Sequence, residues 1–96
     1  MAKVTRRGVV LAESDSAIAL EGNLYFPPGS VTRDHLVSSD QTTACPWKGL
    51  ASYHDIEIDG ETLPGVAWYY PAPSEAAAEI KDHVAFYSCC GIEITP

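Results

Sequence analysis

A tight β-hairpin is predicted by residues 50–70, which read LASYHDIEIDGETLPGVAWYY. Polar and apolar side chains alternate toward the end of residues 50–58, as they do in a strand with one covered face. The dipeptide Asp59-Gly60 favours a two-residue turn, because both central positions of that turn need positive φ. The chain then returns through β-branched and aromatic residues to Tyr70, which predicts a second strand.

The alternation gives the first of these strands two different faces. One face carries Tyr53, Asp55 and Glu57, and the other carries His54, Ile56 and Ile58. Because Asp55 and Glu57 run straight into the exposed turn, we expect their carboxylates to face water while the isoleucines face a core.

Shorter elements precede this hairpin. The apolar runs 8–12 and 17–20 predict a first hairpin, because residues 13–16 between them, Glu-Ser-Asp-Ser, have the composition of a turn. Residues 24–26, Leu-Tyr-Phe, predict a strand. It ends at Pro-Pro-Gly in residues 27–29, since proline cannot continue a sheet ladder.

Helix is predicted in two places. Ser30 is a suitable cap for a single helical turn that runs through Leu36. Residues 74–81 predict the best helix, with Ser74 as the cap, acid in the first turn, strong helix formers, and Lys81 at the end. A helix this short is marginal alone, so we expect its apolar side to pack on a sheet.

Two last strands are expected at residues 84–87 and 92–95, separated near Gly91. Nothing in the sequence repeats and no linker divides it, so residues 1–96 are expected to form one domain. The predicted fold is a mainly β, antiparallel folded sheet with one short helix at about residues 74–81.

Charge and composition narrow the function classes. The chain has 96 residues, with 6 Lys+Arg against 13 Asp+Glu and a formal net charge of −7. Nucleic-acid binding is not expected, because phosphates are neutralised by clustered lysines and arginines. No apolar run approaches the roughly 18 residues of a membrane span, and the basic start lacks the apolar segment of a secretory signal. We therefore expect a soluble, cytoplasmic protein with no membrane partner.

The cysteines Cys45, Cys89 and Cys90 predict neither a disulfide framework nor a metal site. Their number is odd and two of them are adjacent. None belongs to the Cys-x-x-Cys pair that offers two thiolates to zinc, and His35 and His54 complete no ligand set. We expect no metal and no cofactor, and we interpret Cys89 and Cys90 as reduced, partly buried thiols at the end of a strand.

Three aromatic segments stand apart from the rest of the chain. They are Thr-x-Cys-Pro-Trp-Lys-Gly with Ala-x-Tyr in residues 43–53, Ala-Trp-x-Tyr-Pro in residues 67–71, and His-Val-Ala-Phe-Tyr in residues 83–87. In this order they resemble the bacterial family catalogued as domain of unknown function 427, over most of the chain from about Leu24. The resemblance implies a compact, mainly β domain, tent-like or half-barrel, like that of methionine sulfoxide reductase and related zinc proteins. The Cys-x-x-Cys ligands of those proteins are absent here, so their zinc chemistry is not implied.

The family is sometimes labelled nucleotidyltransferase-like. Such enzymes hold Mg²⁺ with carboxylates two residues apart on a strand, together with a Gly-Ser phosphate loop. Asp55 and Glu57 have that spacing, but Gly29-Ser30 is followed by an isolated turn. We interpret the two carboxylates as the solvated face of the hairpin. The resemblance thus implies no activity, cofactor or catalytic residue.

Chemically versatile side chains gather in the three aromatic segments. The candidate ligand-binding residues are Trp47, Lys48, Gly49, Trp68, Tyr70, His83 and Tyr87. Aromatic walls and one ammonium group suit a small polar or anionic molecule, with Lys48 as its charged anchor. The same residues are also typical of a packed core, in which the stem of Lys48 covers Trp47.

Two other functions are compatible with these segments. In an enzyme, the candidate catalytic residues are Cys45 and Lys48 as nucleophiles and His83 as the titratable group. In a protein-interaction or structural module, aromatic residues at an exposed edge strand would form the interface of a homodimer. A structure separates these hypotheses, since Cys45, Lys48, Trp68 and His83 either converge on one cavity or belong to the core.

Overall fold

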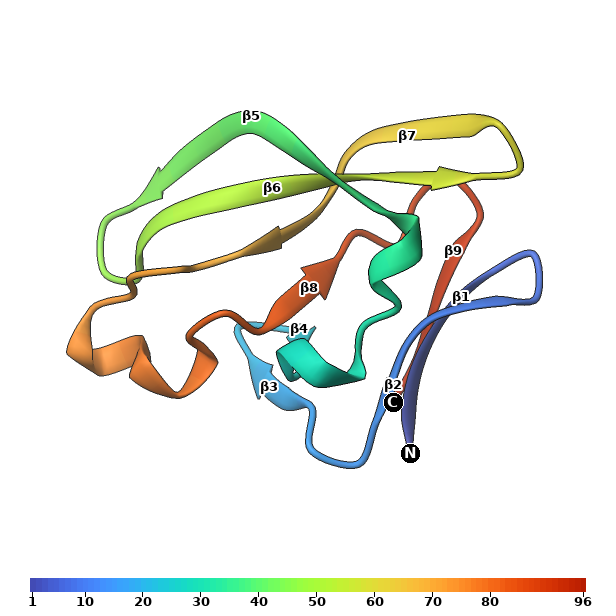
Figure 1. Cartoon of the computed structure of the whole chain (residues 1–96). Helices are drawn as coiled ribbons and strands as arrows, with labels where there is room; N and C mark the ends of the chain where they lie inside the picture. Colours follow the sequence, from blue (N-terminus) through green and yellow to red (C-terminus); the bar gives the residue numbers. More distant parts are fainter.

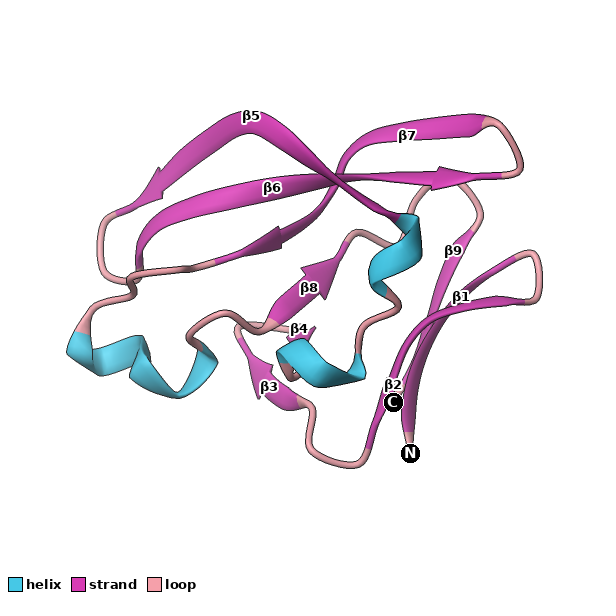
Figure 2. Cartoon of the chain, viewed as in Figure 1, coloured by secondary structure: helices cyan, strands magenta, loops and turns pink.

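Three antiparallel sheets make up the computed structural model, which describes residues 1–96 (Figures 1 and 2). The large sheet has the strand order β5-β6-β7-β8, a second sheet has the order β2-β1-β9, and β3 pairs with β4. The strands are β1 Ala2–Arg6, β2 Val9–Ser14, β3 Ile18–Leu20, β4 Asn23–Tyr25, β5 Leu36–Cys45, β6 Gly49–Ile58, β7 Glu61–Tyr69, β8 Val84–Phe86 and β9 Ile92–Thr95. Three 3-10 segments connect them: η1 Pro28–Ser30, η2 Arg33–His35 and η3 Glu75–Ile80. The predicted mainly β, antiparallel fold is confirmed.

The predicted hairpin of residues 50–70 is the centre of the large sheet. Its turn residues Asp59 and Gly60 have φ angles of +52° and +78°, as a two-residue hairpin turn requires. Ile58 and Glu61 pair directly on either side of that turn. The local turn chemistry is therefore sufficient to set the register of β6 against β7 at this end.

The pairing of β6 with β7 shifts between His54 and Ile56. Beside this irregularity, Asp55 Oδ1 accepts a hydrogen bond from the backbone N–H of Gly65 at 2.8 Å. Glu57 is exposed as predicted, whereas Asp55 is half-buried and binds the neighbouring strand. Asp55 thus stabilises the bulge instead of only facing water, which is the exception to the predicted solvated face.

The first hairpin differs from the prediction. β1 pairs with β2 through the two-residue turn Arg7-Gly8, and β2 continues to Ser14, into the predicted turn at residues 13–16. The two apolar runs are therefore not partners, and β3 pairs with β4 instead. Arg7 and Gly8 both have positive φ, which a tight hairpin turn needs, whereas the Glu-Ser-Asp-Ser segment offers no glycine for such a turn.

The helix predicted at residues 74–81 is confirmed as a helical segment, but it begins at Glu75, ends at Ile80 and is of the 3-10 type. The segment forms η3, two short 3-10 turns joined at Ala77, whose φ and ψ of −118° and 17° are not helical. Ser74 occupies the cap position, but its hydroxyl donates to the Trp47 carbonyl oxygen at 2.6 Å and caps nothing. Ala77 and Ile80 are buried in one hydrophobic cluster with Trp68 and Tyr70, so the apolar side of the segment packs on the sheet as expected.

The single turn expected from Ser30 through Leu36 is also divided. Ser30 ends η1, and its hydroxyl donates to the Pro27 carbonyl oxygen at 2.7 Å instead of capping a helix. η2 follows separately, and Leu36 already belongs to β5. No helix of this structure has the length and apolar character needed to cross a membrane.

Two hydrophobic cores lie on opposite faces of the large sheet. The apolar core consists of Val4, Leu11, Ala12, Phe26, Val31, Ile56, Ile58, Leu63, Val66, Ala67, Val84, Phe86 and Ile92. The aromatic core consists of Tyr25, Ala51, Tyr53, Trp68, Tyr70, Ala77, Ile80 and Ala85. Neighbours in the chain such as Ala67 and Trp68 enter different cores, because side chains alternate along a strand. Figure 1 shows η3 below one end of the large sheet and the β2-β1-β9 sheet at the other end.

Candidate functional site

Lys48 is the charged centre of the residues that the sequence singled out. It lies in the turn between β5 and β6, and only 6% of its surface is exposed. Its ammonium group is hydrogen-bonded and ion-paired to the Glu21 carboxylate, which lies between β3 and β4. The same ammonium is 5.4 Å from the centre of the Tyr70 ring and 5.6 Å from that of Trp47. One carboxylate and two aromatic rings of the chain thus already stabilise this charge.

The protonation states of this pair follow from its geometry. Burial favours the neutral amine of Lys48, but the hydrogen bond to Glu21 and the neighbouring Tyr25 and Tyr70 outweigh it, and the pKa of Lys48 is raised. The hydrogen bond from Lys48 is the main cause that lowers the pKa of the Glu21 carboxyl. Both groups are therefore charged at neutral pH. A protonated ammonium has no free electron pair, so Lys48 in this state is an ion-pair partner and not a nucleophile.

Two neighbours of Lys48 have structural roles. Gly49 has a φ of +116°, and a Cβ atom there would lie 3.3 Å from the carbonyl oxygen of Ala72. This close approach lets β6 begin beside the segment before η3, where the Ser74 N–H donates to the Lys48 carbonyl at 2.9 Å. Cys45 is a half-buried free thiol that packs against the aromatic core.

The predicted aromatic walls are mostly interior. Trp68 and Tyr70 are buried, and Trp68 Nε1 donates to the Tyr25 hydroxyl at 3.2 Å. Trp47 and Tyr87 are exposed in part, and the Tyr87 ring centre lies 4.6 Å from that of Trp68. Tyr25, which the sequence did not single out, therefore connects the Lys48 end of the aromatic core to its Trp68 end.

His83 lies apart from the other candidates. Its Nδ1 atom is 2.8 Å from the carbonyl oxygen of Lys81, in the bend before β8. No hydrogen bond, ion pair or ring contact joins it to Lys48 or Trp68. The structure thus groups Cys45, Trp47, Lys48, Gly49 and Tyr70, continues through Tyr25 to Trp68 and Tyr87, and leaves His83 outside.

Two hollows open on the surface, and neither is lined by Lys48. The larger, about 430 Å³, is lined by Gly22, Asn23, Leu24, Phe86, Tyr87, Ser88, Ile94 and Pro96. The smaller, about 310 Å³, is lined by Pro28, Arg33, His54, Tyr69, Asp82 and Val84. We call the smaller one the Arg33 cavity. It combines charged and aromatic side chains and is the better candidate for a specific site.

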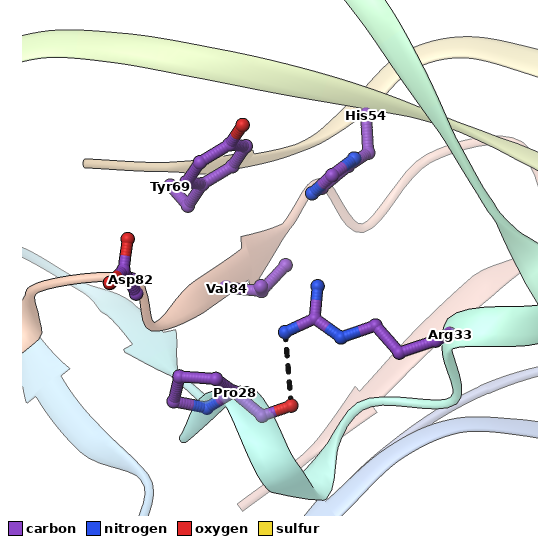
Figure 3. Close-up of a pocket in the computed structure, with 6 residues that line it drawn as sticks. All are labelled: Pro28, Arg33, His54, Tyr69, Asp82 and Val84. Carbon is purple, nitrogen blue, oxygen red and sulfur yellow. Dashed lines mark hydrogen bonds between the residues drawn. The ribbon is translucent and has the colours of Figure 1, made fainter. Parts of the chain in front are cut away.

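The Arg33 cavity brings together side chains from η2, β6 and β7 (Figure 3). Figure 3 shows the Arg33 guanidinium pointing into the space between His54 and Pro28, with Tyr69 and Asp82 on the opposite side. Arg33 Nη2 donates to the Pro28 carbonyl oxygen at 3.0 Å. The His54 and Tyr69 rings stack with centres 4.7 Å apart and planes at 17°. Arg33 takes part in none of the ion pairs of the structure, so its charge has no carboxylate partner.

His54 supplies a neutral polar group beside that charge. Burial first, and then the positive charge of Arg33, lower the pKa of His54, so its ring is uncharged at pH 7. Its Nδ1 atom is buried and has no hydrogen-bond partner. A neutral imidazole has one donor and one acceptor nitrogen. The cavity therefore combines the guanidinium of Arg33 and, on its opposite side, the carboxyl group of Asp82 with the uncharged imidazole of His54.

Sequence reasoning placed His54 on the correct face but assigned no role to Arg33 or Tyr69. Strand alternation offered one usable signal, because Tyr69 must face away from Trp68 and Tyr70, toward the side of His54. No comparable signal existed for Arg33, whose position over the sheet depends on how η1 and η2 fold back. No three His, Cys, Asp or Glu side chains come together where they could hold a metal ion.

Comparison with known proteins bears on the family of the chain. A search of curated proteins found no match. A family model described as "Domain of unknown function (DUF427)" matches residues 1–93, which is nearly the whole chain and includes β1 and β2. The match therefore extends further toward the N-terminus than the three aromatic segments. On this basis the chain belongs to the family of the domain of unknown function DUF427.

Proposed function

We propose that this domain binds a small polar molecule that carries an anionic group, and that the molecule binds in the Arg33 cavity. The observation that carries the proposal is the Arg33 guanidinium, which lacks a carboxylate partner and lies beside neutral His54 and Tyr69. A volume of about 310 Å³ is at the lower end of the roughly 300–1,000 Å³ of small-molecule sites. The ligand is therefore small.

Each side chain has a distinct task in this proposal. The Arg33 guanidinium presents paired N–H donors that match a carboxylate or a phosphate. His54 and the Tyr69 hydroxyl form uncharged hydrogen bonds to the same ligand, and Asp82 attracts a hydroxyl or ammonium group at its other end. Because the chain carries a net charge of −7, an unpaired cation is a local exception to a surface that otherwise repels anions.

Calorimetric titration with small carboxylates, amino acids and phosphate monoesters tests the proposal. Arg33→Gln keeps much of the side chain but removes its charge. A charged hydrogen bond contributes about 1.5–3 kcal/mol, so binding should weaken roughly 10- to 100-fold. Arg7→Gln is the matched control, because Arg7 is an exposed arginine outside the cavity. Equal binding by Arg33→Gln and wild type, or no binding of any compound, would overturn the proposal.

The residues around Lys48 are the alternative place for the same ligand. Here an anion would have to displace the Glu21 carboxylate or bind a charge that is already matched. Lys48→Met distinguishes the two places. A loss of affinity in Lys48→Met together with unchanged affinity in Arg33→Gln would assign the ligand to the Lys48 residues.

A homodimer through β5 is the alternative function. β5 is an edge strand of the large sheet, and its Val37 side chain is exposed. An edge strand offers unpaired backbone groups to a second copy. However, the pairing of β5 with β6 is interrupted between Ser38 and Thr42, and such irregularity is typical of edges that resist association. Light scattering at micromolar concentration decides this, since a mass of about 10.3 kDa, that of one chain, removes the dimer.

A further inference from the structure

Two exposed thiols meet in the turn between β8 and β9. Cys89 and Cys90 are adjacent in the chain, and Cys90 Sγ donates to Cys89 Sγ at 2.8 Å. The sulfurs would have to approach by about 0.8 Å to reach the ~2.05 Å of a covalent disulfide bond. The third cysteine, Cys45, is half-buried beside the aromatic core and has no thiol neighbour. Only the adjacent pair therefore has a partner sulfur within reach.

The backbone of this turn holds the two sulfurs in place. The Ile92 N–H donates to the Cys89 carbonyl at 2.8 Å, and the two residues between them, Cys90 and Gly91, have φ angles of +59° and +83°. Both central residues thus have positive φ, as in the hairpin turn that usually contains Asn-Gly. Cys90 therefore has the positive φ that this turn requires, as Arg7 and Asp59 have before the glycines of their own turns.

Arg6 fixes this turn to the β2-β1-β9 sheet. Its Nε donates to the Cys90 carbonyl oxygen at 2.9 Å, and its Nη2 is ion-paired to Glu61 at 2.8 Å. The Arg6 side chain is itself buried, so the Cys90 carbonyl is bound from the interior of the protein. The thiols are exposed, but the backbone that carries them is anchored to two neighbouring strands.

We propose that Cys89 and Cys90 are a two-electron redox site that closes to a disulfide between adjacent residues when the protein meets a peroxide. One thiolate attacks a peroxide oxygen, the O–O bond breaks, and water leaves from the protonated hydroxide. The sulfenic acid that forms is attacked by the second thiol, so that an S–S bond forms, the S–O bond breaks, and a second water leaves. Two thiols are oxidised and one hydrogen peroxide is reduced to two waters.

The short distance between the two sulfurs favours the disulfide over further oxidation of the sulfenic acid. A sulfenic acid without a nearby thiol waits for a second peroxide and advances to sulfinic acid. Here the resolving thiol is already in contact, so its effective concentration is high. The hydrogen bond between the two thiols raises the pKa of Cys89, so thiolate is scarce at neutral pH and the reaction must be followed for hours.

Mass spectrometry of the reduced chain after hydrogen peroxide tests the proposal. Wild type should lose the mass of two hydrogens, and alkylation should fall from three thiols to Cys45 alone. Dithiothreitol should restore both. Cys45→Ser, the matched control, should still lose two hydrogens, whereas Cys89→Ser and Cys90→Ser should gain oxygen instead. All three changes are conservative, and circular dichroism of each variant checks that it is folded.

Three results of the mass measurement would contradict the redox proposal. The proposal is overturned if wild type gains oxygen atoms without losing hydrogens, or if it forms only disulfides between chains. It is also overturned if Cys45→Ser abolishes the mass loss, because the reacting pair would then include Cys45. None of these outcomes depends on whether a ligand binds in the Arg33 cavity.

Discussion

The apolar core and the aromatic core lie on opposite faces of one sheet but differ in the side-chain atoms that they bury. The apolar core contains no polar side-chain atom, and its Phe26 and Phe86 rings meet edge to face at 6.2 Å. The aromatic core brings three tyrosine hydroxyls and an indole N–H out of water, with the Lys48 ammonium at its margin. The first needs only shape and volume, whereas the second also needs hydrogen-bond partners.

Those partners come from within the chain. Trp68 donates to Tyr25, the Tyr53 hydroxyl lies 2.9 Å from Thr43 Oγ1, and Lys48 pairs with Glu21. Chemically versatile residues therefore concentrate here without forming an open pocket. The unpaired Arg33 charge and the unpartnered His54 nitrogen lie on the other face, at the margin of the apolar core. The Arg33 cavity is the better candidate site because it holds polar groups that lack partners, although reactive side chains are more numerous around Lys48.

The largest effect should come from emptying the apolar core. Phe26 is fully buried, so Phe26→Ala removes its contacts and leaves a cavity. We expect a loss of about 3–5 kcal/mol in the free energy of unfolding, measured by urea denaturation. A loss in unfolding free energy below about 1 kcal/mol would mean that the apolar core rearranges to fill the cavity. Close packing would then not be what stabilises this core.

A single oxygen should matter in the aromatic core. Tyr25→Phe keeps the ring but leaves the buried Trp68 N–H without an acceptor. We expect a loss of about 1–3 kcal/mol in the free energy of unfolding, although almost no volume changes. Tyr69→Phe is the matched control, because Tyr69 is half-buried on the other face of the sheet, and loss of its hydroxyl leaves no buried donor without an acceptor. Equal losses for the two variants would contradict the importance of internal hydrogen bonds.

Elements that depend on local sequence were predictable, and elements that depend on distant contacts were not. The β6–β7 hairpin was predictable because its turn and its alternation are local properties of residues 50–60. The helical segment at residues 74–81 was predictable from its composition, but its 3-10 type and the break at Ala77 were not. β2 pairs with β1 and not with β3, because Arg7 and Gly8 form a two-residue turn with two positive φ angles, whereas residues 13–16 contain no glycine.

The candidate site residues were also only partly predictable, because their partners are distant in the sequence. The chemistry of Lys48 was visible in the sequence, but its partner Glu21 is 27 residues away and belongs to another hairpin. Arg33 and His54 meet only because η2 folds over the face of β6. Which polar groups are paired is a property of the tertiary structure, so residue types alone do not separate a stabilising ion pair from a binding site.

The Lys48–Glu21 pair offers an asymmetric test. Glu21→Gln leaves a nearly buried ammonium without its anion, whereas Lys48→Met leaves a carboxylate whose side chain is 47% exposed and hydrated by water. We therefore expect Glu21→Gln to lower the urea midpoint more than Lys48→Met. A larger effect in Lys48→Met would show that the ring contacts of Lys48 outweigh its ion pair.

Acid should act on the same pair. The pKa of Glu21 is lowered, so the unfolded chain takes up its proton at a higher pH than the folded one. The stability due to Glu21 is therefore present above its ordinary value of 4.5 and lost as pH falls below it. Glu21→Gln should have a flatter dependence of unfolding free energy on pH in that range. Some slope remains, because the pKa of Glu61 is also lowered, by Arg6.

The smallest effect should be the contribution of His54 to the pH dependence of the unfolding free energy. The pKa of His54 is lowered by burial and by Arg33, so below the ordinary value of 6.5 the unfolded chain binds a proton that the folded chain does not. The free energy of unfolding should thus begin to fall as pH drops below about 6.5, before the carboxylates titrate. His54→Gln should remove this slope, whereas His83→Gln, which changes a histidine outside the cavity, should keep it. A slope that survives in His54→Gln would come from another titratable group and would contradict a lowered pKa of His54 in the Arg33 cavity.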